Sequence, residues 1–175
     1  MGKKKINAQK NLSEENTSYK KIYKILILGH DYVGLTAFCH KLKTGKFDPH
    51  LLYNTGIDIS RIIVEMEDGQ KVLFKVYDTK GQKNLREVTR RYFKETDGVI
   101  LIYSIDNKES FDDLDNWVQM LKEEITTDIP RFLIGNKRDL EKERIITFEQ
   151  GAKFAEKHGT KSRRMFCKMW FLGWN

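Results

Sequence analysis

Cysteine, proline and long apolar stretches are all scarce in this chain of 175 residues. Two cysteines and two prolines leave no basis for a disulfide framework or a Pro-rich scaffold. No apolar run reaches the roughly 18–20 residues that a membrane-spanning helix needs. No apolar stretch follows the basic start, as it would in a secretory signal. These absences favour a cytoplasmic protein in a reducing compartment.

Residues that build a hydrophobic core are well represented. Hydrophobic residues make up 39% of the chain, with 10 Phe, 7 Tyr and 3 Trp, which excludes disorder along the whole length. The length fits one domain with short tails. We expect residues 1–18 to form a flexible basic arm, 19–160 a single domain, and 161–175 a divergent basic and aromatic tail.

The net charge of +7 belongs to the two ends of the chain. Residues 1–24 hold seven lysines and two glutamates, and residues 157–175 hold five basic residues and no acidic one. The middle is therefore slightly acidic, unlike a domain built to grip nucleic acid, and we expect no nucleic-acid partner. The basic ends of the chain would either stay in solvent or contact an anionic membrane surface peripherally.

The hydrophobic pattern alternates between strand-like and helix-like segments. Short apolar or β-branched runs predict strands at 23–28, 58–66, 71–77, 98–105 and 132–135. Spacings of three and four predict helices at 34–42, 111–125 and 148–158, the last with Phe148, Ala152 and Ala155 on its inner stripe. This order predicts an α/β layered fold with a mostly parallel sheet and one antiparallel hairpin around Asp68 and Gly69.

A half-matched phosphate loop lies between the first strand and the first helix. Residues 29–36 read Gly-His-Asp-Tyr-Val-Gly-Leu-Thr, against the pattern G-x-x-x-x-G-K-[ST]. Gly29 and Gly34 let the backbone wrap a phosphate, and the helix start favours an anion. The Thr36 hydroxyl is of the type that binds Mg²⁺, but Leu35 replaces the lysine. Alone, this segment fits a glycine-bounded turn equally well.

Three further segments fall at predicted strand ends, where open α/β sheets bind ligands. They read Asn-Thr-Gly-Ile-Asp at 54–58, Asp-Thr-Lys-Gly-Gln at 78–82 and Asn-Lys-Arg-Asp at 136–139. With them, the chain resembles the Ras superfamily of small GTPases from about Tyr23 to Thr160. The runs at 56–58, 98–103 and 114–117 resemble its Rab branch.

The resemblance implies a three-layer small-GTPase fold that binds GTP or GDP with Mg²⁺ and lacks the family's last helix. It implies Rab-type effectors and regulators, and a role in vesicle traffic on intracellular membranes. Gln82 would orient the attacking water. Nucleotide contacts would come from Gly29, Asp31, Val33, Gly34, Leu35, Thr36, Gly81, Asn136, Lys137 and Asp139, and Mg²⁺ contacts from Thr36, Asn54, Thr55 and Asp78.

Several departures from the family predict weakened binding and hydrolysis. Leu35 removes the lysine charge that balances the phosphates, and Asp31 brings a like charge towards them. Asn54 stands where the family's Mg²⁺-binding threonine is expected, and Thr55 lies one position late. The alternative is a pseudo-GTPase, an interaction module that no longer switches. Lys80 and Lys83 near the terminal phosphate would partly compensate for Leu35.

The effector surface and the end of the chain depart further. The family's aromatic effector trio reads Ile59, Tyr77 and Tyr92 here, so partner specificity cannot be transferred. After Gly159 the sequence has neither the family's Ser-Ala-Lys loop nor its closing helix. Residues 165–172 fit an edge strand. The tail fits a truncated or misjoined product, or an aromatic anchor for a membrane or partner.

Overall fold

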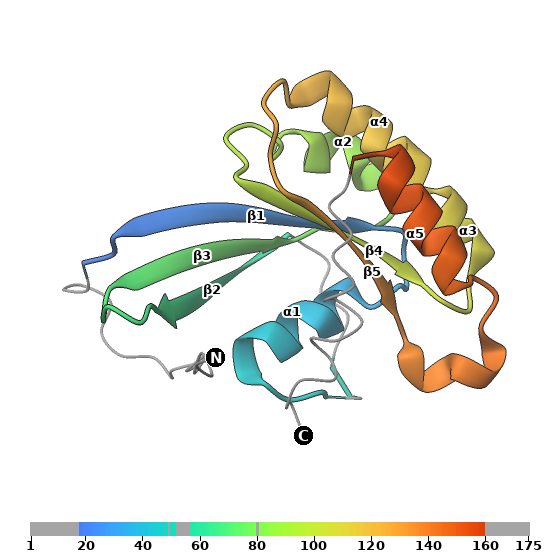
Figure 1. The fold of residues 1–175 in the computed structure, drawn as a ribbon, viewed down its shortest axis with the longest axis horizontal. Coiled ribbons are helices and arrows are strands. Elements are labelled where there is room, and N and C mark those ends of the chain that lie inside the picture. The colour runs from blue at the N-terminus through green and yellow to red at the C-terminus, as the bar shows by residue number, and fades with distance from the viewer. Residues whose placement is uncertain (1–17, 49, 52–56, 80, 160–175) are drawn as a thin grey trace.

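The computed structural model describes residues 18–48, 50–51, 57–79 and 81–159. Within them, a five-stranded sheet of order β2-β3-β1-β4-β5 lies between two layers of helices (Figure 1). The pairs β1–β3, β1–β4 and β4–β5 are parallel, and β2–β3 is the antiparallel hairpin. The strands are β1 (Lys21–Gly29), β2 (Asp58–Glu65), β3 (Lys71–Asp78), β4 (Gly98–Ser104) and β5 (Arg131–Asn136). The predicted α/β fold is thus confirmed.

The helices divide unequally between the two faces of the sheet. Helix α1 (Leu35–Thr44) lies on one face, and the other helices lie on the opposite face (Figure 1). These are α2 (Arg86–Arg90), α3 (Lys108–Asp112), α4 (Leu114–Glu124) and α5 (Phe148–Lys157), with short 3-10 turns at η2 (Lys83–Leu85) and η3 (Arg138–Glu143). No helix in this part of the chain is long and apolar enough to cross a membrane.

Two hydrophobic clusters form on opposite faces because strand side chains alternate. Leu26 and Leu28 of β1 pack with Trp117 beneath α4, whereas Ile27 packs with Phe38 beneath α1. Strand β4 is buried along nearly its whole length, as predicted for a strand covered on both faces. The two clusters pack against β1 and β4 from opposite faces, and these central strands carry the loops of the candidate site.

The predicted inner stripe of α5 was wrong for two of its three residues. Phe148 is 50% exposed and Ala152 is exposed, whereas Phe154 and Ala155 are buried. The helix turns Gly151 towards the sheet, where an added Cβ would lie 2.9 Å from the Tyr103 hydroxyl. A pattern read from apolar side chains overlooks a glycine that brings a helix close to a sheet.

The helix predicted at 111–125 is divided into α3 and α4 at Asp113, which keeps right-handed helical angles. Its apolar positions are buried as expected, among them Leu114, Val118 and Leu121. The basic arm before residue 18, the tail, and the strand predicted at 165–172 lie outside the described residues. Statements about them, including the lack of a last helix, stay predictions.

Candidate nucleotide-binding site

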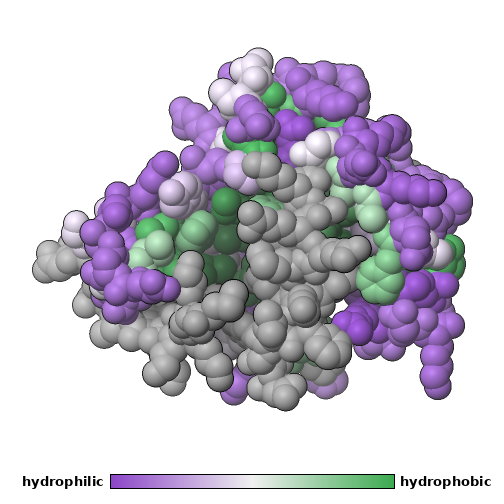
Figure 2. Space-filling view, in the orientation of Figure 1, coloured by the Kyte–Doolittle hydropathy of each residue, from purple (hydrophilic) through white to green (hydrophobic). Residues whose placement is uncertain are grey.

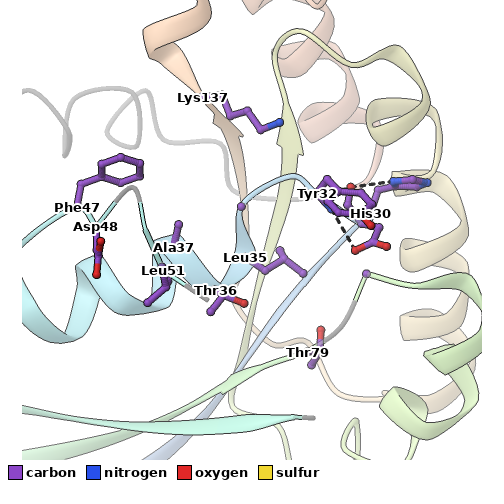
Figure 3. Close-up of a pocket in the computed structure, with 13 residues that line it drawn as sticks. His30, Tyr32, Leu35, Thr36, Ala37, Phe47, Asp48, Leu51, Thr79 and Lys137 are labelled. Atoms are coloured by element: carbon purple, nitrogen blue, oxygen red, sulfur yellow. Dashed lines mark hydrogen bonds between the residues drawn. The ribbon is translucent and has the colours of Figure 1, made fainter. Parts of the chain in front are cut away.

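A cleft of about 390 Å³ opens beyond the carboxyl ends of the parallel strands (Figure 3). Four parts of the chain line it: the loop after β1 with the start of α1, the segment after α1, the segment after β3, and the residue after β5. The lining residues are His30, Asp31, Tyr32, Gly34, Leu35, Thr36, Ala37, Phe47, Asp48, Leu51, Thr79, Gly81 and Lys137.

The two glycines of the loop are required by its geometry. A Cβ on Gly29 would lie 2.2 Å from the carbonyl oxygen of Ile102, inside any allowed contact. Gly34 has a φ of +89°, and a Cβ there would lie 2.7 Å from the Asn136 side-chain nitrogen. The backbone thus takes a tight course that side chains would block. It ends at the first turn of α1, where helix N–H groups favour an anion.

Asn136 ties the segment after β5 to the phosphate loop. Its Nδ2 atom donates a hydrogen bond of 2.8 Å to the backbone carbonyl oxygen of Val33. The next residue, Lys137, has a φ of 60° and lines the cleft. Asp139 is exposed and is not a lining residue. The structure therefore brings Asn136 and Lys137 to the loop and leaves Asp139 at the surface of η3.

The segment after β3 approaches the same loop from the other side. A Cβ on Gly81 would lie 2.2 Å from the carbonyl carbon of His30 and 2.4 Å from the backbone nitrogen of Asp31. Only glycine fits this approach. Gln82 is half-buried and does not line the cleft. Lys80, proposed as a compensating cation, lies outside the described residues.

Candidate ligands for a divalent cation come from α1 and β3. Thr36 lines the cleft at the first turn of α1, and the carboxylate of Asp78 belongs to a residue only 2% exposed. Burial, followed by the charges of Asp78 and Asp58, raises the pKa of the Cys39 thiol well above its ordinary value. A hydroxyl and a carboxylate are hard oxygen donors, which suit Mg²⁺.

The metal site is not assembled by the described residues alone. Asn54 and Thr55, the other two predicted ligands, lie outside them. Among the described residues, no group of three or more His, Cys, Asp or Glu side chains could hold a metal ion. Thr36 and Asp78 thus fit Mg²⁺ in donor type, and the remaining ligands stay predictions.

Leu35 presents only carbon atoms to the cleft. It is 7% exposed and belongs to the apolar cluster beneath α1 with Ile27 and Phe38. Its Cδ2 atom would lie 3.2 Å from a Cβ on Gly29, so it packs against the start of the loop. The phosphate-binding lysine of the motif is replaced here by an apolar contact.

Asp31 contributes a negative charge within the loop itself. Its Oδ1 atom accepts a hydrogen bond of 3.2 Å from the backbone nitrogen of Tyr32 (Figure 3). Tyr32 has a φ of 60° and is 75% exposed. The Asp31 carboxylate therefore accepts a hydrogen bond from one of the backbone N–H groups that a phosphate loop offers to its ligand.

A buried ion pair anchors the segment that follows Gln82. Arg86, just after η2, pairs with Asp113, whose side chain is 3% exposed, and its guanidinium lies 4.8 Å from the Trp117 ring centroid. Asn116 donates a second hydrogen bond of 2.9 Å to Asp113. Burial acts to raise the pKa of Asp113, but the hydrogen bonds from Arg86 and Asn116 outweigh it and lower this pKa.

Several lining residues were not predicted from the sequence. His30 and Tyr32 occupy unspecified positions of the loop pattern, and Thr79 lies inside the quoted run 78–82. Phe47 and its neighbours in the lining belong to a segment without a recognised motif. A search for aromatic residues shortly after the first helix would have found Phe47, which is 62% exposed.

Comparison with known proteins agrees with this geometry. The sequence model of the Ras family matches residues 24–166. The chain belongs to the Ras family. It is 32% identical over 144 residues to Ras-related protein Rab-8B of Homo sapiens, covering 82% of this chain and 69% of that protein.

Other Rab proteins give similar matches. Ras-related protein Rab-13 of Canis lupus familiaris is 33% identical over 144 residues, covering 82% of this chain and 70% of that protein. Ras-related protein Rab-8 of Diplobatis ommata is 32% identical, covering 82% and 68% respectively. The chain is therefore a Rab-like member of the family, as the resemblance predicted.

Proposed function

We propose that this chain is a Rab-like GTPase that binds GTP or GDP with Mg²⁺ in the cleft, with weakened binding and hydrolysis. The proposal rests on one observation: the loop has the backbone shape of a phosphate loop but lacks the positive charge that such loops present to phosphate. Its glycines and its bond from Asn136 are in place, whereas Leu35 and Asp31 remove positive charge and add negative charge. Family membership supports a role in vesicle traffic, in the cytoplasm and peripherally on intracellular membranes.

The loop supplies the main phosphate contacts. Backbone N–H groups of the loop and the first turn of α1 would donate to phosphate oxygens. Thr36 and Asp78 would hold Mg²⁺, which neutralises phosphate charge when bound. The backbone N–H of Gly81 would approach the terminal phosphate, because Gly81 already lies against the loop.

Recognition of the base would come from the opposite end of the cleft. Asn136 and Asp139 would read the guanine edge, and the Lys137 stem would lie along the base and sugar. The exposed ring of Phe47 lies at this end of the cleft (Figure 3). A planar base stacked on such a ring gains roughly 1–3 kcal/mol, which explains a large aromatic side chain left exposed beside a cleft.

Affinity would be limited by Leu35 and Asp31 together. A charged hydrogen bond to phosphate is worth roughly 1.5–3 kcal/mol, and leucine supplies none. The Asp31 carboxylate must leave the Tyr32 N–H before a phosphate oxygen can take it, and it repels that oxygen. Both effects grow with the γ-phosphate, so GTP should lose more affinity than GDP.

Catalysis would depend on Gln82, which would orient the attacking water. Poor GTP binding limits turnover even with this residue in place. The alternative is an interaction module that no longer switches. The Asp31–Tyr32 hydrogen bond favours it, because the Tyr32 N–H then has a partner within the loop without a bound phosphate. Either form could bind Rab-type partners through Ile59, Tyr77 and Tyr92, since Tyr77 and Tyr92 lie with ring centroids 5.6 Å apart and Ile59 pairs with Tyr77 across the hairpin.

A nucleotide titration distinguishes a weakened GTPase from a module that no longer switches. Fluorescent GDP and GTP would be added to the full chain with and without Mg²⁺, with ATP as competitor. The proposal expects guanine-specific binding in the micromolar range or weaker, tighter for GDP than for GTP and improved by Mg²⁺. Saturation at nanomolar concentrations contradicts the weakening, and equal competition by ATP contradicts the guanine assignment. Absence of binding even at millimolar nucleotide favours the module that no longer switches.

A further inference from the structure

An apolar groove of about 550 Å³ lies on the sheet face that carries α1. Residues of all five strands line it, and α1 forms one wall. One residue from each strand and one from α1 define it: Ile25, Ile62, Phe74, Ile100, Phe132 and Phe38. Figure 2 shows hydrophobic side chains gathered left of centre, bordered above and to the left by hydrophilic ones.

The groove face lacks the cover that the other face has. Among the described residues, α1 is the only helix on it, whereas four helices cover the opposite face (Figure 1). Burial on β1 and β4 differs between the two faces. Leu26 and Leu101, on the face covered by four helices, are 0% exposed, whereas Ile25 and Ile100, which line the groove, are half-buried. A continuous apolar surface of this kind normally marks a contact site.

We propose that the chain's own tail, residues 160–175, docks in this groove. Seven of the eight residues at 165–172 are apolar, with Phe166, Trp170 and Phe171 among them. Large aromatic side chains bury the most apolar area per residue, which suits a groove walled by aliphatic and aromatic side chains. The basic residues before this run would stay in solvent as the connection.

The tail begins close enough to reach the groove. Helix α5, after which it follows, lies against β5, and Phe132 and Ile134 of that same strand line the groove. Within the described residues β5 pairs only with β4 and is therefore an edge strand of the sheet. To reach the groove from α5, the tail needs only to go round this edge. Packed layers are about 10 Å apart, and 16 extended residues reach roughly 50 Å.

The tail is joined to the described part of the chain at Gly159. Gly159 has a φ of +61°, and a Cβ there would meet no atom within 4 Å. Gly159 therefore has the left-handed conformation that commonly follows a helix. A segment tethered in this way has an effective concentration on the order of millimolar, so it has an advantage over an outside partner or a second copy. Docking needs no nucleotide and does not rest on the proposed function.

Cysteine cross-linking tests the proposal with the full chain, because Cys167 lies in the tail. In a Cys39→Ala background, Lys41→Cys places a thiol on α1 at the groove wall, and Lys122→Cys places a matched thiol on α4 of the opposite face. Under mild oxidation we expect an intrachain disulfide from position 41 to Cys167, at least about fivefold more than from position 122. Peptide mapping identifies each disulfide.

Each other outcome overturns the proposal. Equal cross-linking at both positions, or none, means that the tail does not dock there. Disulfides between chains that increase with protein concentration assign the groove to a second copy. Recovery of the chain on phosphatidylcholine–phosphatidylserine vesicles, with no intrachain disulfide in their absence, makes the tail a membrane anchor.

A second measurement does not depend on the introduced cysteines. Phe166→Ser, Trp170→Ser and Phe171→Ser, combined in the full chain, should raise the fluorescence of an apolar dye severalfold and lower the Tm by about 4–8 °C or more. Lys161→Ser with Arg163→Ser is the matched control in the same tail and should change neither. Unchanged dye binding and Tm in the triple variant would overturn the proposal, because solvent-exposed substitutions have little effect.

Discussion

The side-chain Nδ2 of Asn136 and the backbone oxygen of Val33, 103 positions apart in the sequence, are joined by a 2.8 Å hydrogen bond. This bond holds the end of β5 against the phosphate loop. The residue proposed to read the base therefore also shapes the loop proposed to hold the phosphates.

Asn136→Ala should lower both stability and nucleotide affinity. Loss of the bond to Val33 should cost about 1–2 kcal/mol in the free energy of unfolding, measured by urea denaturation without nucleotide. Asp139→Ala is the matched variant, because Asp139 is exposed and should change stability by less than about 0.5 kcal/mol. It should still remove the preference for GTP over ATP in competition binding. If Asp139→Ala keeps that preference, base recognition does not use Asp139.

Asp31→Ser should tighten nucleotide binding, and more for GTP than for GDP. The substitution removes a negative charge and the carboxylate oxygen bound to the Tyr32 N–H. An expected gain of roughly 1–2 kcal/mol corresponds to about five- to thirtyfold in Kd. Asp48→Ser, another lining aspartate outside the loop, is the control and should give the smaller gain. Equal gains from both would mean that general charge, and not the loop bond, limits affinity.

Removal of one partner of the buried pair Arg86–Asp113 should strongly destabilise the domain. Asp113→Ala should cost about 3–5 kcal/mol, because it leaves the guanidinium buried without its carboxylate. Lys108→Ala breaks the exposed pair with Asp112, where the side chains are 67% and 57% exposed, and should cost under about 1 kcal/mol. Urea denaturation measures both. A cost below 1 kcal/mol for Asp113→Ala would show that Arg86 finds another partner.

The same pair predicts a direction of pH dependence. The pKa of Asp113 lies below its ordinary value of 3.8 in the folded chain. The carboxylate therefore stabilises the fold fully above the unfolded pKa, and this contribution is lost as the pH falls through the folded pKa. The stability difference between wild type and Asp113→Asn should be largest near pH 7 and should shrink below about pH 4. A difference that is constant with pH contradicts this assignment.

Much of the fold was predictable because its signals are local. Strand β4 is a continuous apolar run, and the hairpin is marked by Asp68 and Gly69, so both elements were found within a few residues. Gly29, Gly34 and Thr36 matched the phosphate loop in type and spacing, and the segments at 54–58, 78–82 and 136–139 were needed to distinguish it from a glycine-bounded turn. Such patterns report backbone conformation and burial, which neighbouring residues largely determine.

The missed features depend on contacts between distant segments. Gly151 lies close to the Tyr103 hydroxyl, and Gly81 lies close to the backbone at His30. The pair Arg86–Asp113 joins two segments 27 positions apart. Charged residues in a sequence usually indicate solvent exposure, so nothing in the pattern marked Asp113 as buried.

The charge of the phosphate loop, and not its shape, is what we propose limits nucleotide binding. Leu35→Lys restores the missing charge and should tighten GDP and GTP binding by about ten- to a hundredfold. Leu35→Met is the matched control, because it keeps an apolar side chain of similar volume and should leave affinity unchanged. Thermal melting would confirm that both variants fold.

The most direct test is the Kd of fluorescent GDP and GTP for wild type, Leu35→Lys and Leu35→Met, measured with Mg²⁺. We expect weak binding by wild type and Leu35→Met, weaker for GTP than for GDP, and at least about tenfold tighter binding by Leu35→Lys. Wild-type chain that retains GDP through purification at nanomolar affinity, with no gain from Leu35→Lys, would contradict it and would assign the compensating charge to Lys80 or Lys83.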